Sequence, residues 1–285
     1  MDAGIEERGG CESRNFSMKV LALDFDGVIS DSALESFVVA LRTFEAFDPD
    51  GTISESAKEL RHATSETIRR HPLFVGFVDL MPLGNRAEDM GLALQCLSEG
   101  KQVEDQAAWN SLREQTSVDF LRDFHQRFYR EREILRNQDF DAWLALLAPF
   151  RSFVDLLHRR QGDCVLALAT AKDRPSVELL LEAYSISSLF VPSRIIDKEA
   201  GVSKRAHLGV LQERLGVSFE DITFVDDKVN HLEDVSQLGV RSALASWGYN
   251  GARERRRASA RGFLVCELET ADAQLFDAPG GAGRS

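Results

Sequence analysis

The stretch Val20-Leu21-Ala22-Leu23-Asp24-Phe25-Asp26-Gly27-Val28 decides the fold when it is set beside a second one, Ile222-Thr223-Phe224-Val225-Asp226-Asp227. Each stretch begins with an apolar run typical of a strand that is covered on both faces, and two aspartates follow each run. In an open α/β sheet the carboxyl ends of the parallel strands lie at one edge, where ligands bind. We therefore expect the four carboxylates to meet at that edge, although the two pairs are far apart in the chain.

The four aspartates indicate a cation site. Carboxylates gathered at one point repel one another unless a cation lies between them. Hard oxygen ligands suit Mg²⁺, so we expect Mg²⁺ as the cofactor. A cation beside an aspartate at a sheet edge is a setting for phosphate chemistry. Taken singly, however, a pair of aspartates after a strand could equally cap the next helix or hydrogen-bond a turn.

Length and composition narrow the classes of protein. The 285 residues suffice for one large domain or two of ordinary size, and a hydrophobic content of 44% suffices for a core. The formal net charge of −12 argues against nucleic acid and against an anionic membrane as partners, while a few local Lys and Arg residues can still attract an anionic substrate. The four cysteines are scattered, which argues against a zinc site or a disulfide framework.

The N-terminal residues 1–16 are polar and contain no apolar signal-peptide stretch, and no apolar run is long enough to span a bilayer. We therefore expect a cytoplasmic protein.

The order of strand and helix patterns predicts an α/β fold with an insertion. A Rossmann-like parallel sheet is expected from 17–31 and 149–275, with disordered tails at 1–16 and 276–285. A mostly helical segment, called here the helical insertion (32–148), interrupts the sheet after its first strand. Beyond Pro149, strands are expected at 164–169, 193–196, 222–225, 240–245 and 263–266, and helices at 150–159, 175–184, 204–215 and 229–238.

Two further side chains are expected at the same sheet edge. Thr170 ends an apolar strand, and its hydroxyl with the backbone N–H of Ala171 can bind a phosphoryl oxygen without adding charge. A helix cap or turn role would explain the threonine alone equally well. Lys204 opens a helix, from which it can reach back to the carboxylates and balance phosphate charge.

Two other lysines are candidates of lower rank. Lys198 competes with Lys204, but its acidic neighbours are typical of a surface lysine. Lys172 either lines the entrance of the site or is solvated.

The order of these motifs resembles that of the haloacid dehalogenase superfamily of phosphohydrolases. A DxDG motif at Asp24, a strand that ends in Thr170, the lysine at 204 and the pair Asp226-Asp227 follow one another as they do in that superfamily. The helical insertion is similar to the superfamily's mobile helical cap in position and helical character, and it is longer than the commonest small caps. The motifs cover the sheet part of the chain.

The resemblance implies roles for the residues. Asp24 is similar to the nucleophile that attacks phosphorus and becomes a transient aspartyl-phosphate. Asp26 is similar to the general acid/base, which requires a protonated state and hence a raised pKa. The phosphate-binding residues implied are Thr170, Ala171 and Lys204. The implied Mg²⁺ ligands are the carboxylate of Asp24, the backbone carbonyl of Asp26, and Asp227 with Asp226 beside it.

The fourth motif departs from the commonest pattern. Many members of the superfamily carry a further acid four residues after the motif aspartate, whereas here His231 stands at that spacing from Asp227. The consecutive pair is the superfamily's alternative, and which of Asp226 and Asp227 binds the metal directly stays open. We interpret His231 as a helix residue near the rim of the site.

The expected activity is Mg²⁺-dependent hydrolysis of the phosphomonoester of a small phosphorylated metabolite. Two alternatives stay open: a phosphomutase that uses the same aspartyl-phosphate, and a non-catalytic phosphate-binding regulator with the same fold. A dehalogenase is disfavoured because it needs no acid at Asp26, and a response-regulator receiver is a much shorter domain. Oligomeric state is not readable from the sequence.

Three residue groups concern recognition. A basic stretch of the helical insertion either faces the substrate or is solvated surface charge: Arg61, His62, Arg69, Arg70 and His71. The basic run 253–257 is interpreted as a solvated helix face or loop. A phenylalanine-rich set is expected to form the core of the insertion: Phe37, Phe44, Phe74, Phe77, Phe120, Phe124 and Phe128.

Overall fold

The computed structural model describes residues 20–84, 86–201 and 203–277. The predicted tails at 1–16 and 276–285 lie outside these ranges, except for Phe276, which ends a helix, and Asp277. A parallel sheet of six strands runs in the order β5-β4-β1-β6-β7-β8, which confirms the predicted Rossmann-like sheet. Its strands are β1 (Val20–Leu23), β4 (Val165–Ala169), β5 (Ile195–Ile196), β6 (Ile222–Asp226), β7 (Arg241–Ala245) and β8 (Leu264–Cys266).

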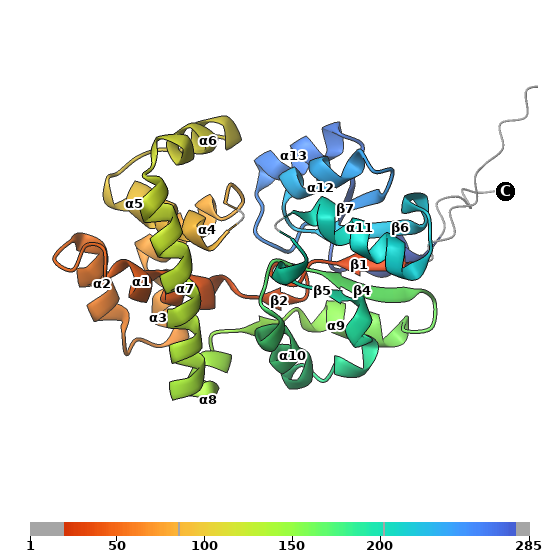
Figure 1. Cartoon of the computed structure of the whole chain (residues 1–285), viewed down its shortest axis with the longest axis horizontal. Helices are drawn as coiled ribbons and strands as arrows, with labels where there is room; N and C mark the ends of the chain where they lie inside the picture. Colours follow the sequence, from red (N-terminus) through yellow and green to blue (C-terminus); the bar gives the residue numbers. More distant parts are fainter. Residues whose placement is uncertain (1–19, 85, 202, 278–285) are drawn as a thin grey trace, which may run out of the picture.

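Helices cover both faces of this sheet (Figure 1). One face packs against α9 (Arg151–Arg159), α10 (Arg174–Ala183) and α14 (Ala271–Phe276). The other packs against α11 (Lys204–Leu215), α12 (Val229–Ser236) and α13 (Ala252–Ala260). Because both faces are covered, the strands are apolar almost throughout, and all four residues of β1 are buried.

The register of the central strands brings the two aspartate pairs together. Strand β1 lies between β4 and β6, and Leu23 is level with Leu168 on one side and with Val225 on the other. The next residue, Asp24, donates its backbone N–H to the Val225 carbonyl at 2.9 Å. Asp24 and Asp226 therefore leave neighbouring strands at the same level of the sheet.

Most predicted elements are present, with shifted ends. The strand expected at 193–196 is reduced to Ile195–Ile196, because Pro192–Arg194 form a 3-10 turn. The helix expected at 229–238 ends at Ser236, two residues before its predicted end. Helix α11 begins and ends as predicted, and Gly216 after it takes the left-handed conformation that residues with a Cβ avoid.

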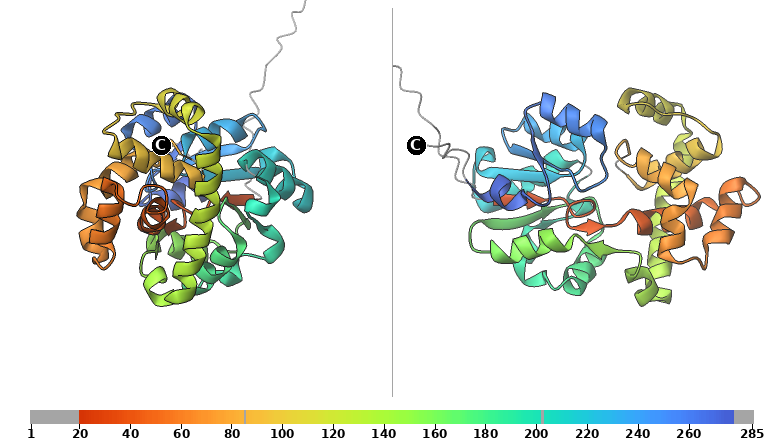
Figure 2. Two further views of the ribbon diagram at one scale, coloured as in Figure 1. Left: turned by 60° about the vertical axis from the view of Figure 1, so that its left-hand side comes forward. Right: turned by 180° about the vertical axis from the view of Figure 1, so that it is seen from behind.

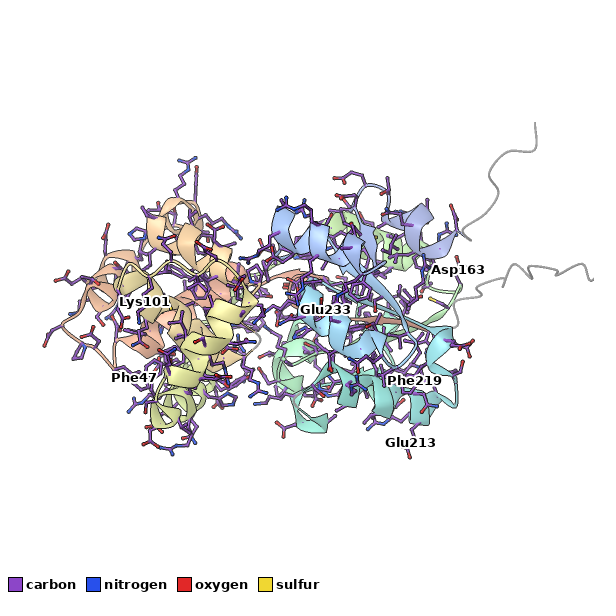
Figure 3. All side chains as sticks on the ribbon, turned by 90° about the horizontal axis from the view of Figure 1, so that it is seen from above. Phe47, Lys101, Asp163, Glu213, Phe219 and Glu233 are labelled. Carbon is purple, nitrogen blue, oxygen red and sulfur yellow. The ribbon has the colours of Figure 1, made fainter. Side chains whose placement is uncertain are left out.

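The helical insertion lies beside the sheet part (Figure 2). Its core is separate and contains Phe37, Phe77 and Phe124, all fully buried, as the interpretation of the phenylalanine set predicted. In Figure 3, Phe47 and Lys101 mark the insertion, and Phe219 and Glu233 mark the sheet part. The helices are α1 (Ala33–Phe44), α2 (Thr52–Leu60), α3 (Ser65–Arg70), α4 (Pro72–Leu80), α5 (Ala87–Ser98), α6 (Gln106–Gln115), α7 (Val118–Gln138) and α8 (Phe140–Leu144).

The chain enters and leaves the insertion through two short paired strands. β2 (Ser30–Asp31) and β3 (Ala148–Pro149) are antiparallel, and the Phe150 N–H donates to the Ile29 carbonyl at 2.9 Å. The two crossings of the chain therefore run side by side.

Within the described ranges, no helix is long and apolar enough to cross a membrane. Cys96, Cys164 and Cys266 are free thiols.

Candidate active site

Asp24 lies at the centre of a group of charged residues at the carboxyl edge of the sheet. Its Oδ1 accepts hydrogen bonds from the Phe25 N–H and from Lys204 Nζ, each at 2.7 Å. The first residue of α11 therefore does reach back to the strand ends, as predicted. Lys204 is buried, and its Nζ also donates to the Ala169 carbonyl at 2.7 Å and lies 3.6 Å from Asp226 Oδ2.

Asp24, Asp226 and His231 can converge on one point. Each offers a ligand atom, and these atoms all lie within 4.8 Å of one another. His231, on the first turn of α12, has Nδ1 2.9 Å from Asp226 Oδ2. The interpretation of His231 as a residue of the rim is therefore corrected: the helix starts so close to the end of β6 that this side chain folds back onto Asp226.

Asp227 is held tightly behind this group. Its Oδ2 accepts the Tyr249 N–H at 2.8 Å, while its buried Oδ1 has no hydrogen-bond partner among the described residues. Two glycines make room for it, because a Cβ on Gly27 would lie 2.3 Å from Asp227 Oδ2, and one on Gly248 would lie 2.3 Å from Asp227 Cβ. Gly27 also has φ +80°, a conformation that favours glycine.

Burial and neighbouring charges shift the pKa values of the three carboxyls in different directions. Burial raises the pKa of Asp24 above its ordinary value, although Lys204 opposes the rise. Burial, with Asp226 next to it, raises the pKa of Asp227 much further. For Asp226 the cost of burial is outweighed by His231 and Lys204, so its pKa is lowered. Two cationic or potentially cationic groups face these carboxyls: Lys204 contacts Asp24, and His231 contacts Asp226.

This donor set fits a divalent cation. Three buried carboxyls supply hard oxygen atoms, and the unpartnered Oδ1 of Asp227 is a buried acceptor that lacks a donor. Asp24, Asp226 and His231 are the residues that lie close enough together to share an ion within the described part of the chain. Asp227, predicted as a ligand beside Asp226, is not part of that close group.

Asp26 lies across the same cavity with different partners. Its Oδ1 accepts hydrogen bonds from Lys172 Nζ, at 3.0 Å, and from the Ser32 hydroxyl. Burial alone would raise its pKa, but Lys172, Ser32 and Arg132 outweigh burial, so the pKa of Asp26 is lowered. The expectation of a raised pKa is therefore wrong for this arrangement, because the sequence did not show that a buried lysine contacts the carboxylate.

Lys172 is one of the residues that the sequence ranked too low. It is not a solvated lysine, since only 2% of its surface is exposed. The backbone turn after β4 buries it: its N–H donates to the Thr170 Oγ1 at 3.1 Å, which brings the chain around toward Asp26. Its position two residues after a strand that ends in threonine was the available signal.

The predicted phosphate-binding residues share one cavity with the two aspartates. Thr170, Ala171 and Lys204 line it together with Asp24 and Asp26, and its volume is about 340 Å³. Lys198 lines it as well, with Nζ 3.9 Å from the centre of the Tyr129 ring, so it is not an ordinary surface lysine. The ion pair to Asp24 nevertheless comes from Lys204.

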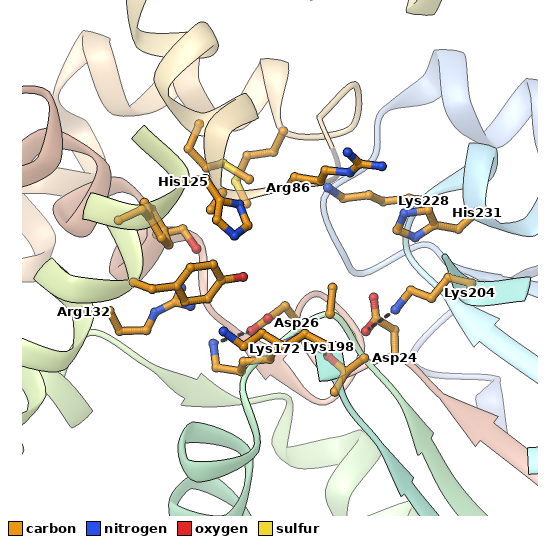
Figure 4. Close-up of a pocket in the computed structure, with 18 of the residues that line it drawn as sticks. Asp24, Asp26, Arg86, His125, Arg132, Lys172, Lys198, Lys204, Lys228 and His231 are labelled. Atoms are coloured by element: carbon orange, nitrogen blue, oxygen red, sulfur yellow. Dashed lines mark hydrogen bonds and ion pairs between the residues drawn. The ribbon is translucent and has the colours of Figure 1, made fainter. Parts of the chain in front are cut away.

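The helical insertion forms the opposite wall of this cavity. In Figure 4, Arg86, His125 and Arg132 face Asp24 and Asp26 across the open space. Arg132 is buried and makes a bidentate pair with Glu35 of α1, at 2.6 and 2.8 Å. Apolar side chains complete the wall: Met81, Ala87, Met90 and Phe128. Apart from Phe128, which was expected in the core of the insertion, the sequence pointed to none of these residues, because the segments that carry them have no local motif.

The basic stretch singled out in the insertion is solvated surface charge. None of its described residues lines the cavity. Arg61 pairs with Glu45, Arg69 with Asp31 and Arg70 with Glu66, and all three arginines are substantially exposed.

The run 253–257 lies on α13, where most of its arginines contact the protein itself. Arg255 donates to the Ser246 carbonyl at 2.6 Å, and Arg257 pairs with Glu233 at 2.6 Å. Arg253 donates to the Glu104 carbonyl of the helical insertion. These contacts brace the fold, and they disagree with a purely solvated interpretation.

Comparison with known proteins identifies the fold. No protein-family model matches the sequence, and no curated protein resembles it significantly. Solved structures do match. One is a haloacid dehalogenase-like hydrolase from Streptococcus pneumoniae, with a TM-score of 0.57, 15% identity and coverage of 85% of this chain and 90% of that one.

Two other similar structures carry a more specific name. A predicted phosphoglycolate phosphatase from Haemophilus somnus has a TM-score of 0.55 and 16% identity, over 84% of this chain and 92% of that one. A Lactobacillus delbrueckii protein, provisionally named a phosphoglycolate phosphatase, has a TM-score of 0.62 and 13% identity, over 92% and 99%. The chain therefore has the fold of haloacid dehalogenase-like hydrolases, which confirms the resemblance at the level of the fold.

Proposed function

We propose that this protein is a Mg²⁺-dependent phosphatase that hydrolyses the phosphomonoester of a small metabolite through an aspartyl-phosphate on Asp24. The observation that carries the proposal is the convergence of Asp24, Asp226 and His231 on one point, with Lys204 in contact with the first two. The resemblance of the motifs and the phosphatase names of structural neighbours support the same class of reaction.

The surroundings of Asp24, and the residues that line the cavity, suit the roles proposed for them. Lys204 fixes the Asp24 carboxylate by its Oδ1, and within the described residues no hydrogen bond reaches Oδ2, which leaves that atom for attack on phosphorus. Thr170 and Ala171 line the same cavity, where the threonine hydroxyl and the backbone N–H of Ala171 are the groups proposed to hold the phosphoryl oxygens. A divalent cation held by Asp24 and Asp226, with Asp227 and the Asp26 carbonyl as the further ligands that the motif resemblance implies, would offset the charge repulsion between carboxylate and phosphate.

In this proposal Asp26 acts first as the general acid and then as the general base. As the bond from Asp24 to phosphorus forms, the ester bond breaks, and the leaving oxygen takes a proton from Asp26. The Asp26 carboxylate then takes a proton from the water that displaces Asp24, which releases inorganic phosphate and restores both residues. A phosphate dianion next to Asp26 raises its pKa toward the protonated state, opposing Lys172 and Ser32.

The Asp24→Asn variant tests the proposal. We expect the amide to remove the nucleophile and to reduce phosphate release from generic phosphomonoesters by about 10³-fold or more. Circular dichroism and gel filtration should show an unchanged fold, since the two side chains have nearly the same shape. Activity within a few-fold of the wild type would overturn the assignment of the nucleophile.

The Asp26→Asn variant tests the second role. Phosphoryl transfer to Asp24 can still occur with an activated leaving group such as p-nitrophenolate, but breakdown of the phospho-enzyme should be slow. Quench-flow measurements should therefore show a burst of p-nitrophenol followed by a steady rate reduced by about 10²-fold. An increase of KM at an unchanged kcat would instead show a binding role.

A further inference from the structure

The cavity carries more positive charge than transfer of a single phosphoryl group explains. Six Lys or Arg residues and only three Asp or Glu residues line it, in a chain whose formal net charge is −12. Three of the cations have close carboxylate partners: Lys204 pairs with Asp24 at 2.7 Å, Lys172 with Asp26 at 3.0 Å and Arg132 with Glu35 at 2.6 Å. The remaining three are Arg86, Lys198 and Lys228.

Arg86 and Lys228 meet where the helical insertion touches the sheet part. Lys228 follows the Asp226-Asp227 pair and is 8% exposed, and its Nζ donates to the carbonyl of Gly84 in the insertion. Arg86 stands two residues after this glycine, in the same loop. Figure 4 shows both side chains on the side of the cavity opposite Lys172 and Lys198.

Neither cation has a close carboxylate partner. Across the described ranges, no ion pair joins Lys228 Nζ to a carboxylate, although the lysine charge acts on the neighbouring Asp227 carboxyl, and Nζ keeps two N–H donors for another acceptor. The Arg86 guanidinium has one loose ion pair, 3.8 Å from Glu88 Oε1. Arg113 and His125 contact the Glu88 carboxylate more closely, at 2.9 and 2.8 Å, so Arg86 is the most distant of its three partners.

The start of helix α5 adds little to this positive potential. Glu88 and Asp89 lie in its first turn, and Asp89 Oδ2 accepts the Arg86 N–H at 3.0 Å. The site therefore depends on the two side chains, a guanidinium and an ammonium group that together can bind a carboxylate or a phosphate group.

We propose that Arg86 and Lys228 bind a second anionic group on the leaving-group side of the substrate. The inference rests on the proposed phosphatase function and narrows its substrate class to small phosphomonoesters that carry a carboxylate or a second phosphate. A bound anion contacts the insertion through Arg86 and the sheet part through Lys228, so it connects the two walls of the cavity. Met81 and Met90 line the same space and suit a short carbon chain between the two anions.

Three esters of one carbon skeleton test the proposal on the full chain with Mg²⁺. Glycerol 3-phosphate carries no second anion, 3-phosphoglycerate carries a carboxylate, and glycerol 1,3-bisphosphate carries a second phosphate. We expect kcat/KM for at least one doubly anionic ester to exceed that for glycerol 3-phosphate by about tenfold or more, which corresponds to 1.4 kcal/mol. The better of the two identifies the preferred anion.

Substitution of Arg86 and Lys228 tests whether these two residues cause the preference for a second anion. Arg86→Gln and Lys228→Gln should each reduce this ratio of kcat/KM values by about tenfold. Arg253→Gln is the matched control, because Arg253 also joins the sheet part to a backbone carbonyl of the insertion, that of Glu104, but does not line the cavity. Its ratio should equal that of the wild type. Arg86 is 48% exposed on its side chain, so the Arg86→Gln variant is expected to fold.

The outcomes distinguish failure of the proposed anion site from failure of the proposed phosphatase function. Turnover of glycerol 3-phosphate with no preference for a second anion overturns the subsite and leaves the phosphatase intact. An equal loss of preference in Arg253→Gln also overturns it, since contact between insertion and sheet part would then be the cause. Absence of Asp24-dependent turnover for all three esters removes the proposed function, and the subsite with it.

Discussion

Lys172 Nζ lies 3.0 Å from Asp26 Oδ1, and the lysine that makes this contact is almost completely buried. A charged group is removed from water at a cost unless it is paired, so the lysine is held in the site by the carboxylate that it neutralises. The same ammonium group faces the space where a phosphate would bind. Asp26 and an incoming substrate therefore compete for one cation.

We expect Lys172→Met to reduce kcat/KM for all phosphomonoesters by about 10²-fold, the scale of losing one preorganised charged donor. Steady-state kinetics at saturating Mg²⁺ measures the loss. Lys198→Met is the control, because Lys198 lines the same cavity but contacts the Tyr129 ring and pairs only loosely with Glu199, at 3.8 Å. Equal losses in the two variants would mean that only the summed charge of the cavity matters.

Mg²⁺ should stabilise the fold. The ion relieves repulsion among buried carboxyls and binds only the native state, so at a concentration 100 times its Kd the free energy of unfolding should rise by about 2.7 kcal/mol. Urea unfolding with Mg²⁺ and with a chelator measures the difference. Asp226→Asn should abolish the stabilisation and Asp227→Asn should weaken it, because Asp226 belongs to the close group with Asp24.

Asp234→Asn serves as the control for this series. Asp234 lies on the same helix as His231, is half exposed and pairs with Arg205 at 3.4 Å. It should keep the full response to Mg²⁺. A loss as large as that of Asp226→Asn would show that the ion binds elsewhere on α12.

Gly27→Ala should destabilise the protein through two separate effects. The alanine must adopt φ +80°, which costs about 1–2 kcal/mol, and its Cβ meets Asp227 Oδ2 at 2.3 Å, which adds about 1–3 kcal/mol of overpacking. Gly100→Ala isolates the first effect, since Gly100 has φ +64° and no atom within 4 Å of its added Cβ. Urea unfolding of both variants should therefore give a larger loss at Gly27; equal losses would contradict the close packing of Asp227.

His207 should make stability depend on pH. Its Nε2 lies 2.9 Å from the Gly201 carbonyl, and its buried Nδ1 has no partner among the described residues. Burial, with Lys204 nearby, lowers the pKa of His207 to about 4 from the ordinary 6.5. The folded protein therefore holds the neutral ring, while the unfolded chain takes up a proton as the pH falls below 6.5.

The stability that His207 contributes is thus complete above pH 6.5 and is lost progressively toward pH 4, by about 3 kcal/mol in total. Denaturant unfolding across this range should show a flatter dependence on pH for His207→Gln than for the wild type. His62→Gln, at an exposed histidine of the helical insertion, should leave the slope unchanged. Parallel slopes for the wild type and His207→Gln would contradict the assignment.

The sheet and its edge could be predicted because their signals are local. An apolar run followed by aspartate marks both β1 and β6, and the parallel pairing of strands then brings Asp24 beside Asp226. Helix α11 was equally clear, with Lys204 at its start and Gly216 at its end. Each of these features depends on residues that are neighbours in the chain.

The other half of the site depends on tertiary packing. Three cavity residues come from a loop and a long helix of the insertion: Arg86, His125 and Arg132. In the sequence these segments look like any amphipathic segment. Only the packing of α5 and α7 brings the three side chains to the cavity that holds the aspartates. The basic stretch that includes Arg61 was more conspicuous in the sequence, yet it forms ion pairs at the surface. His231 was misjudged for a related reason, since helix spacing gives no measure of how closely α12 follows β6.

The paired segments Ser30–Asp31 and Ala148–Pro149 place the two ends of the helical insertion side by side. Antiparallel partners lie about 5 Å apart, so a tight turn of two residues can connect Asp31 to Ala148 directly. A deletion of that kind would retain the order and direction of all six strands, together with Asp24, Thr170, Lys204 and Asp226. A change of sequence between these two points would therefore alter the wall that carries Arg86 and Arg132, while the aspartates at the edge of the sheet would keep their strands.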